Sequence, residues 1–325
     1  MEFLVRRKVD ASLVRKVVAC LVCGAPWLMA VAVYGAQLNP LPPPVARGLE
    51  PARDAMEQRQ WKQADSLLRA YLASAGASAE ARYLLAFTLF REGLAGDSLA
   101  EYTRAAKLRA PTAADLQTVA LDYVLLNDYP DADRWMTRSA KMDPGDGETW
   151  YGLGRIHYTE NRFADAVASF ERALLLLPRS VKVENNLGLA LEGLNRPDEA
   201  ERAYRQAMAW QADATTPSEQ PMLNLGILLS DRNQLDEALL LLKQAVAIAP
   251  KDPKIHTALG TLYRRRDELA AAQVEFEVAL AALPEDAALH FQLGQVYRKE
   301  GLEAKARAEL ARAAELNGTH SSPER

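Results

Sequence analysis

Apolar side chains recur at helical spacing along this chain, in short stretches separated by polar turns. Trp150 and Leu153 fall on one face of a predicted helix, and Ala166 and Phe170 fall on one face of the next. Polar residues around Asn161 interrupt the pattern between them. A period close to 3.6 residues on both sides of a short break predicts two helices joined by a turn.

Small residues repeat at a fixed interval along the same stretches. The interval is 34 residues throughout, except for one of 38 between the fifth and sixth segments. Self-similarity at this period predicts a stack of helix-turn-helix repeats, with small residues where two helices cross. The glycines of the series are Gly154, Gly188, Gly226, Gly260 and Gly294, and the alanines are Ala132, Ala166, Ala200, Ala238, Ala272 and Ala306.

One segment carries a recognisable motif. Trp150-x-x-Leu153-Gly154, followed by Ala166, Phe170, Ala173 and Pro178, resembles a tetratricopeptide repeat, or TPR. The resemblance covers residues 45–318 and implies an all-α fold, a right-handed superhelical solenoid of about eight helix-turn-helix repeats. The expected repeats start near residues 45, 79, 113, 147, 181, 219, 253 and 287.

The first three expected repeats depart from the pattern. Ala52, Ala86 and Ala120 replace the glycine, and Ser98 stands where the series has alanine. Alanine suits a helix, so we expect the fold to persist, but Pro51 is expected to disturb the first helix. The longer interval places extra residues at 213–218, which predicts a surface loop.

Charge and cysteine usage narrow the function classes. The 325 residues contain 39 Lys and Arg against 43 Asp and Glu, with a formal net charge of −4. This acidic, mixed-sign balance argues against a nucleic-acid partner, because phosphate binding needs a basic surface. The two cysteines, Cys20 and Cys23, lie in an apolar run without a second ligand pair, which argues against a zinc or redox site.

The first residues predict a targeting segment. Residues 17–36 carry no charge and follow a cluster of Arg and Lys. Residues 1–36 are therefore expected to be a cleaved signal peptide or a retained membrane anchor, and both place the repeats outside the cytoplasm. A lipoprotein signal at Cys20 fits less well because little apolar sequence precedes it. Residues 37–44 form a Pro-rich spacer, and residues 319–325 form a short tail.

The resemblance also implies a binding groove lined by the first helix of each repeat. Asn186 and Asn224 occupy corresponding positions, as in an asparagine ladder that holds an extended peptide, although solvated helix-surface asparagines are the alternative. A carboxylate clamp for chaperone tails is incomplete in this chain. A basic cluster near the end of the array either receives an anionic ligand or is a solvated face balanced by nearby acids; its members are Arg264, Arg265, Arg266, Arg298 and Lys299. The expected groove residues are Tyr151, Arg155, Tyr158, Asn185, Asn186, Asn224, Lys254, Arg264 and Arg298.

The sequence lacks the motifs that indicate a catalytic, phosphate-binding or metal site. The chain has no nucleophile elbow and no phosphate-binding loop, and His256 and His290 recur 34 residues apart rather than converging on a metal site. We therefore expect no enzyme and no cofactor, and a scaffold that binds a protein or peptide in the cell envelope. The alternative is a structural subunit that stacks end to end. The polar residues Lys305 and Arg307 on the last helix favour a monomeric array.

Overall fold

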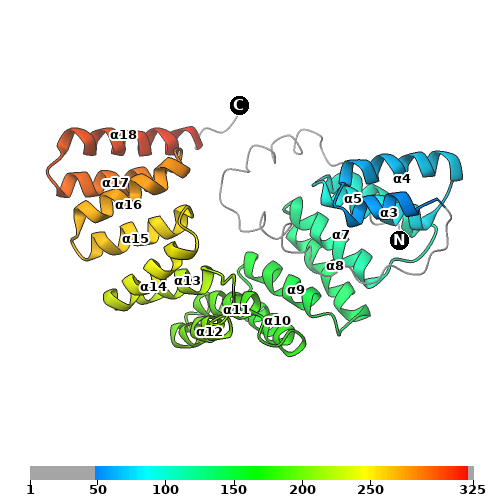
Figure 1. Cartoon of the computed structure of the whole chain (residues 1–325), viewed down its shortest axis with the longest axis horizontal. Helices are drawn as coiled ribbons and strands as arrows, with labels where there is room; N and C mark the ends of the chain where they lie inside the picture. Colours follow the sequence, from blue (N-terminus) through cyan, green and yellow to red (C-terminus); the bar gives the residue numbers. More distant parts are fainter. Residues whose placement is uncertain (1–47, 321–325) are drawn as a thin grey trace. The chain divides into compact units, whose positions relative to one another are not determined.

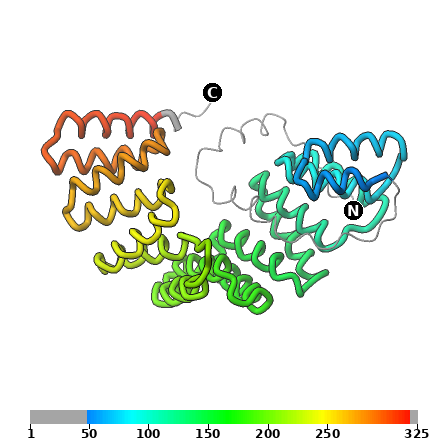
Figure 2. The backbone as a smooth tube through the Cα atoms, in the orientation of Figure 1, coloured from blue at the N-terminus to red at the C-terminus, as the bar shows by residue number. Residues whose placement is uncertain are grey.

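The computed structural model describes residues 48–320, which are helical throughout apart from short turns and loops. The chain divides into two compact regions, residues 1–160 and 161–325, here called the N-terminal and C-terminal regions. The all-α repeat fold expected from the sequence is confirmed, because the described residues form helix after helix and no strand. In each region the helices stack in sequence order (Figures 1 and 2).

The helices pair as the sequence predicts, with a short turn inside each pair and a second turn before the next. Those of the N-terminal region are α3 (Glu50–Glu57), α4 (Trp61–Ala75), α5 (Ala79–Arg91), α6 (Ala95–Ala106), α7 (Ala113–Leu125), α8 (Tyr129–Met142) and α9 (Gly147–Thr159). Those of the C-terminal region are α10 (Phe163–Leu176), α11 (Val181–Gly193), α12 (Pro197–Trp210), α13 (Gln220–Asp231), α14 (Leu235–Ile248), α15 (Pro253–Arg265), α16 (Leu269–Ala282), α17 (Ala287–Lys299) and α18 (Glu303–His320).

Two short-range signals fix where the helices end and begin. The turn within a pair has one residue with a left-handed backbone, for example Asn195 at φ 56° and Asn233 at φ 60°. Asparagine tolerates this conformation better than most residues. The next pair often begins with an aspartate cap, as where Asp252 accepts a hydrogen bond from the backbone N–H of Lys254 at 2.9 Å. Polar turn residues thus set the length of each helix.

Small residues allow the two helices of a pair to cross closely. A Cβ atom added at Gly188 would lie 2.4 Å from the ring of Tyr204, and one at Gly260 would lie 2.8 Å from the ring of Phe276. Both rings are fully buried. The recurring glycine is therefore a packing requirement, because any side chain there would overlap a core residue.

The helix bounds show how the array begins at α3 and where it ends at α18. Pro51 does not remove the first helix, because it lies in the first turn of α3, where a missing N–H is tolerated. The last helix, α18, runs to His320, beyond residue 318 at which the array was expected to end. The right-handed superhelix implied by the resemblance stays a prediction.

The expected targeting segment, the spacer and both cysteines lie outside the described residues. Among the helices that the structure does describe, none is both long and apolar enough to cross a membrane. Signal peptide and membrane anchor therefore both stay predictions.

Candidate peptide-binding surface

The first helices of successive repeats form one face of the C-terminal region. Helices α11 and α13 are in contact, as are α13 and α15, and α15 and α17. Each also packs on the second helix of its own pair, so the four helices are held in fixed order. Six of the nine expected groove residues lie on these four helices.

Two asparagines join neighbouring helices of this face. The Nδ2 of Asn224 on α13 donates a hydrogen bond to the Oδ1 of Asn185 on α11, at 2.9 Å. Asn185 is only 6% exposed, whereas Asn224 is half-buried. An amide has two donor hydrogens and an acceptor oxygen with two lone pairs, so Asn224 keeps capacity for a ligand while it holds Asn185.

The asparagine predicted as the second rung of a ladder makes a different contact. The Nδ2 of Asn186 donates to the backbone oxygen of Lys182, one turn earlier in the same helix, at 2.7 Å. The hydrogen bond to Asn224 comes instead from the neighbouring position, Asn185. The structure thus brings Asn185 and Asn224 together and gives Asn186 a contact within its own helix.

The cations of α15 and α17 fall into two groups. Arg265 donates to Asp231 at 2.6 Å, and Lys299 lies 3.4 Å from Asp267. Both form ion pairs with acids of the preceding repeat or turn. The arginine that follows α15, Arg266, pairs with Asp236 and Glu268, and its hydrogen bond to Glu268 is the main cause of the raised pKa of its guanidinium group. These three cations therefore fit the second interpretation given above, a solvated face whose positive charges are balanced by nearby acids.

The three expected cationic groove residues differ from that group. Within the described residues, no ion pair is formed by Lys254, Arg264 or Arg298. Among the residues that the structure describes, Arg298 donates a side-chain hydrogen bond only to the neutral Gln295. Arg264 is half-buried, and its Nε is shielded from solvent without a hydrogen-bond partner in the described part of the chain.

Apolar side chains accompany these cations. Phe291 on α17 is 50% exposed and Ile227 on α13 is 40% exposed, although both are large hydrophobic residues. Neither is among the groove residues expected from the sequence, because exposure of an apolar side chain depends on how closely the neighbouring helices pack. The candidate surface therefore combines amides, cations and apolar groups.

The other three expected groove residues lie on α9, in the N-terminal region. Tyr151 is 7% exposed, and burial raises the pKa of its hydroxyl. The guanidinium carbon of Arg155 lies 5.7 Å from the centre of the Tyr151 ring, a cation–π contact. Tyr158 is half-buried. Tyr151 is therefore mostly a core residue of its region.

The histidines make structural contacts. His256 and His290 each lie between a glutamate of the same repeat and the carbonyl oxygen of the preceding proline, at 2.6 and 3.0 Å for His256 and 2.6 and 3.1 Å for His290. Within the described residues, no group of three His, Cys, Asp or Glu side chains is placed to hold a metal ion.

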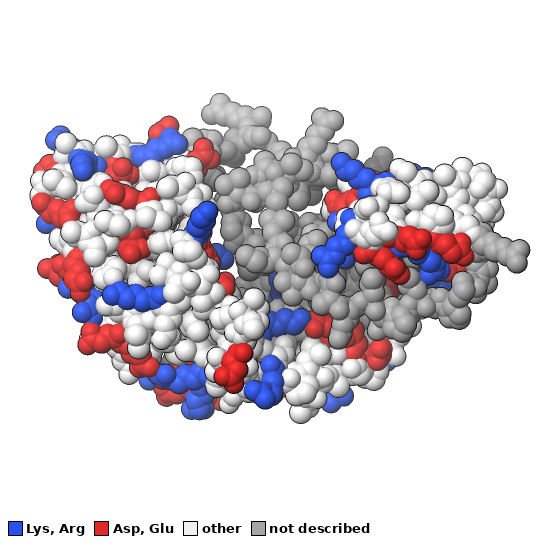
Figure 3. Space-filling model, viewed as in Figure 1, with Lys and Arg blue, Asp and Glu red and all other residues white. Residues whose placement is uncertain are grey.

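Charges of both signs are interspersed over the visible face of the C-terminal region (Figure 3).

Comparison with protein families gives the same repeat type in three stretches. Tetratricopeptide repeats match residues 120–180, 179–251 and 287–320. Among curated proteins, Protein FlbA of Caulobacter vibrioides is 28% identical over 142 residues, which span 44% of this chain and 23% of FlbA. The chain therefore matches less than a quarter of that relative's length.

Solved structures show the same fold. A tetratricopeptide repeat protein from Parabacteroides merdae has a TM-score of 0.62 and 16% identity, covering 76% of this chain and 96% of its own. PilW, a type IV pilus biogenesis factor, has a TM-score of 0.57 and 24% identity, covering 65% and 95%. The Cut9–Hcn1 hetero-tetramer of APC/C has a TM-score of 0.61 and 17% identity, covering 82% and 52%. Taken with the helix pairs and the 34-residue interval, these matches establish that the chain belongs to the tetratricopeptide repeat family.

Proposed function

We propose that this protein is a non-enzymatic scaffold that binds an extended peptide on the face formed by α11, α13, α15 and α17. The TPR fold supports a protein–protein interaction role, and repeat proteins of this kind are typically scaffolds. The observation that carries the choice of surface is the Asn185–Asn224 hydrogen bond. It holds a half-buried amide at the surface, where it can bind a peptide backbone of any sequence.

The surface suits a peptide better than a small molecule. The amides and the apolar side chains of Phe291 and Ile227 are spread over three helices, which matches the length of an extended segment. Backbone amides of the ligand would bond to Asn224, and ligand side chains would cover Phe291 and Ile227.

A displayed library of random peptides, selected on the immobilised full chain, tests this proposal. We expect enriched peptides whose binding falls about tenfold with Asn224→Ala, because one amide that makes two backbone hydrogen bonds is lost. Gln206→Ala, at an exposed position of α12, is the matched control and should bind as the parent does. Enriched peptides that bind the Asn224→Ala chain equally well would rule out this surface.

We further propose that the repeats act in the cell envelope, outside the cytoplasm. The support is the uncharged stretch at residues 17–36 after a basic cluster, together with the fold shared with PilW. Alkaline phosphatase fused after residue 44 should be active in bacteria, and deletion of residues 1–36 should abolish the activity. N-terminal sequencing of the mature chain then separates a cleaved signal peptide from a retained anchor. Activity that survives the deletion would contradict export by this segment.

The array is proposed to be a monomer. Lys305, Arg307 and Glu315 on the terminal helix α18 are exposed, so its outer face carries charge. A polar outer face on a terminal repeat disfavours end-to-end stacking. Light scattering should give one mass at all protein concentrations, and a mass that rises with concentration would support the stacking alternative.

A further inference from the structure

Helices α15 and α17 are unusual in the sign of their charge. Lys254, Arg264 and Arg265 lie on α15, Arg298 and Lys299 lie on α17, and neither helix contains an aspartate or a glutamate. The chain as a whole carries more acidic than basic residues. The two helices are in contact, and Arg264 and Arg298 occupy corresponding positions on them, so these two arginines lie on the same side of the helix pair.

Internal ion pairs account for only part of this charge. Asp231 pairs with Arg265, and Asp267 pairs with Lys299. Lys254, Arg264 and Arg298 keep no carboxylate partner within residues 48–320. Glu300, directly after α17, also makes no ion pair with them, and its Oε2 is shielded without a hydrogen-bond partner in the described chain. Three positive charges on adjacent helices are therefore available to an external anion.

Arg264 differs from the paired cations of these helices. It lies 34 residues before Arg298, at the corresponding position in the last turn of its helix. The negative end of a helix dipole favours a cation in the last turn, which explains the location of both arginines. Arg264 is half-buried, so part of its side chain stays accessible, and no carboxylate of the described chain pairs with its guanidinium group, whose shielded Nε also has no acceptor there. A carboxylate oxygen is the acceptor that a guanidinium group binds best.

An exposed aromatic ring accompanies the cations. Phe291, Gln295 and Arg298 are separated by four and three residues on α17, so they lie along one face of that helix. Phe291 is 50% exposed. A free anion or a phosphate would leave that ring uncovered, whereas an acidic peptide with apolar side chains would satisfy the arginines and cover the ring together.

We propose that the peptide bound by this face is acidic, with carboxylates that engage Arg264 and Arg298 and an adjacent apolar side chain that packs on Phe291. This inference rests on the proposed function and adds the chemistry of the partner. In the C-terminal region α15 and α17 thus select the ligand by its charge, whereas the neighbouring amide of Asn224 binds the peptide backbone whatever the peptide's sequence.

The test uses the full chain and a labelled synthetic peptide in which Glu alternates with Leu and Phe. Arg264→Gln and Arg298→Gln should each weaken binding about tenfold at low salt, because each removes a charge-assisted hydrogen bond. Arg265→Gln and Lys299→Gln are matched controls, since Asp231 and Asp267 already neutralise these cations, and they should change the affinity less than about twofold. Equal losses in all four variants would overturn the proposal and leave only non-specific charge attraction.

Two further probes separate the alternatives. The same peptide with Gln in place of Glu should bind at least about tenfold more weakly, and phosphatidylglycerol vesicles should not bind in an Arg264-dependent way. Equal binding of the Gln peptide would overturn the acidic preference, and Arg264-dependent vesicle binding would assign the site to lipid. If library selection yields peptides sensitive to Asn224→Ala that are not acidic, this inference fails while the proposed function stands. If no peptide is enriched, both fail.

Discussion

The N-terminal and C-terminal regions build the same helix pair with different residues at the point where the two helices cross. In the N-terminal region Ala86 packs in one cluster with Tyr102. In the C-terminal region Gly188 lies at the corresponding place, with Tyr204 so close that an added Cβ would be 2.4 Å from its ring. A tyrosine thus fits against alanine in one region and against glycine in the other. The difference shows that helix separation, and not the partner residue alone, decides whether a methyl group fits.

The regions also differ in what they bury between repeats. In the N-terminal region the Oγ of Ser98 lies 2.6 Å from the Oδ2 of Asp122 and 2.9 Å from the carbonyl oxygen of Ala86. Both side chains are fully buried. At the corresponding positions of the C-terminal region the chain has Ala200 and Leu228, which are apolar. The serine that breaks the alanine series is therefore part of a buried polar pair.

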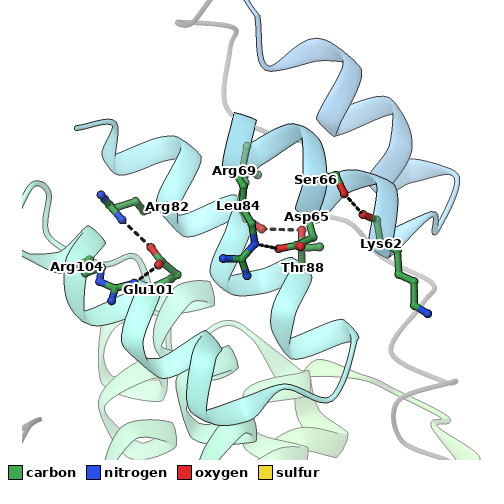
Figure 4. Close-up of polar contacts among 9 residues, drawn as sticks. All are labelled: Lys62, Asp65, Ser66, Arg69, Arg82, Leu84, Thr88, Glu101 and Arg104. Atoms are coloured by element: carbon green, nitrogen blue, oxygen red, sulfur yellow. Dashed lines mark hydrogen bonds and ion pairs between the residues drawn. The ribbon is translucent and has the colours of Figure 1, made fainter. Parts of the chain in front are cut away.

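A third difference concerns the polar bridge between the two helices of a pair. In the N-terminal region Arg82 donates to Glu101 at 2.8 Å, and Arg104 joins the same carboxylate (Figure 4). In the C-terminal region His256 and His290 take the place of Arg82, each bonded to the glutamate nineteen residues later. The same pair of positions forms a bridge in both regions, while the residue on the first helix changes from arginine to histidine.

The largest expected effect comes from the buried acid. The hydroxyl of Ser98 has one proton for two acceptors, Asp122 and the carbonyl oxygen of Ala86, so the buried carboxyl group of Asp122 has at most one donor there. Burial raises the pKa of Asp122 well above 3.8. A raised pKa gives stability that is present below the unfolded value and lost as the pH rises through the folded value. Asp122→Asn should therefore stabilise the chain at neutral pH by about 1–3 kcal/mol, with no difference near pH 3.

Urea unfolding, followed by tryptophan fluorescence at several pH values, checks this expectation. Trp61, Trp135 and Trp150 report on the N-terminal region, and Trp210 reports on the C-terminal region. The pH-dependent gain should be confined to the N-terminal signal, which comparison with Trp210→Phe isolates. A constant difference between parent and variant at all pH values would show that folding does not raise the pKa of Asp122.

The next largest effect on stability is expected where the two helices of a pair cross. Gly188→Ala should destabilise the C-terminal region by about 1–2 kcal/mol, because overlap with the buried Tyr204 ring outweighs the helix propensity gained. The same alanine placed in a Tyr204→Ala chain should cost little, because the ring that its methyl group would overlap is then absent. Thermal unfolding of the four chains measures the coupling, and strictly additive effects would contradict the steric explanation.

Much of the fold was predictable because close helix crossings need small residues, which recur visibly at Gly188 and Gly260. The contact between Asn185 and Asn224 was not, because adjacent positions on a helix point about 100° apart and the repeat frame alone favoured Asn186. The hydrogen bond between Ser98 and Asp122 joins two repeats and was not predictable either, because the sequence pattern shows only that Ser98 departs from the alanine series. By contrast, the glutamate nineteen residues after both His256 and His290 was a signal that could have revealed their bridges.

The polar bridge made by His256 should have a moderate effect on stability. His256→Gln keeps one donor for Glu275 but cannot also bond to the carbonyl oxygen of Pro250, so we expect a loss of about 1 kcal/mol. His256→Arg should restore the bond to Glu275, as Arg82 bonds to Glu101 in the N-terminal region. Hydrogen exchange of α15 and α16 measures both. Equal protection in the parent and the Gln variant would show that the bridge does not stabilise this pair.

The smallest effect belongs to ion pairs at the surface of the C-terminal region. Arg232 donates to Asp198 at 2.6 Å, but the Asp198 side chain is 72% exposed, whereas the Glu101 side chain of the N-terminal bridge is 8% exposed. Water and salt screen an exposed pair, so Asp198→Asn should change the thermal midpoint by the equivalent of less than about 0.5 kcal/mol, and the change should vanish in high salt. A larger loss that persists in high salt would mean that ion pairs stabilise the two regions alike, because the contrast between buried and exposed bridges would no longer hold.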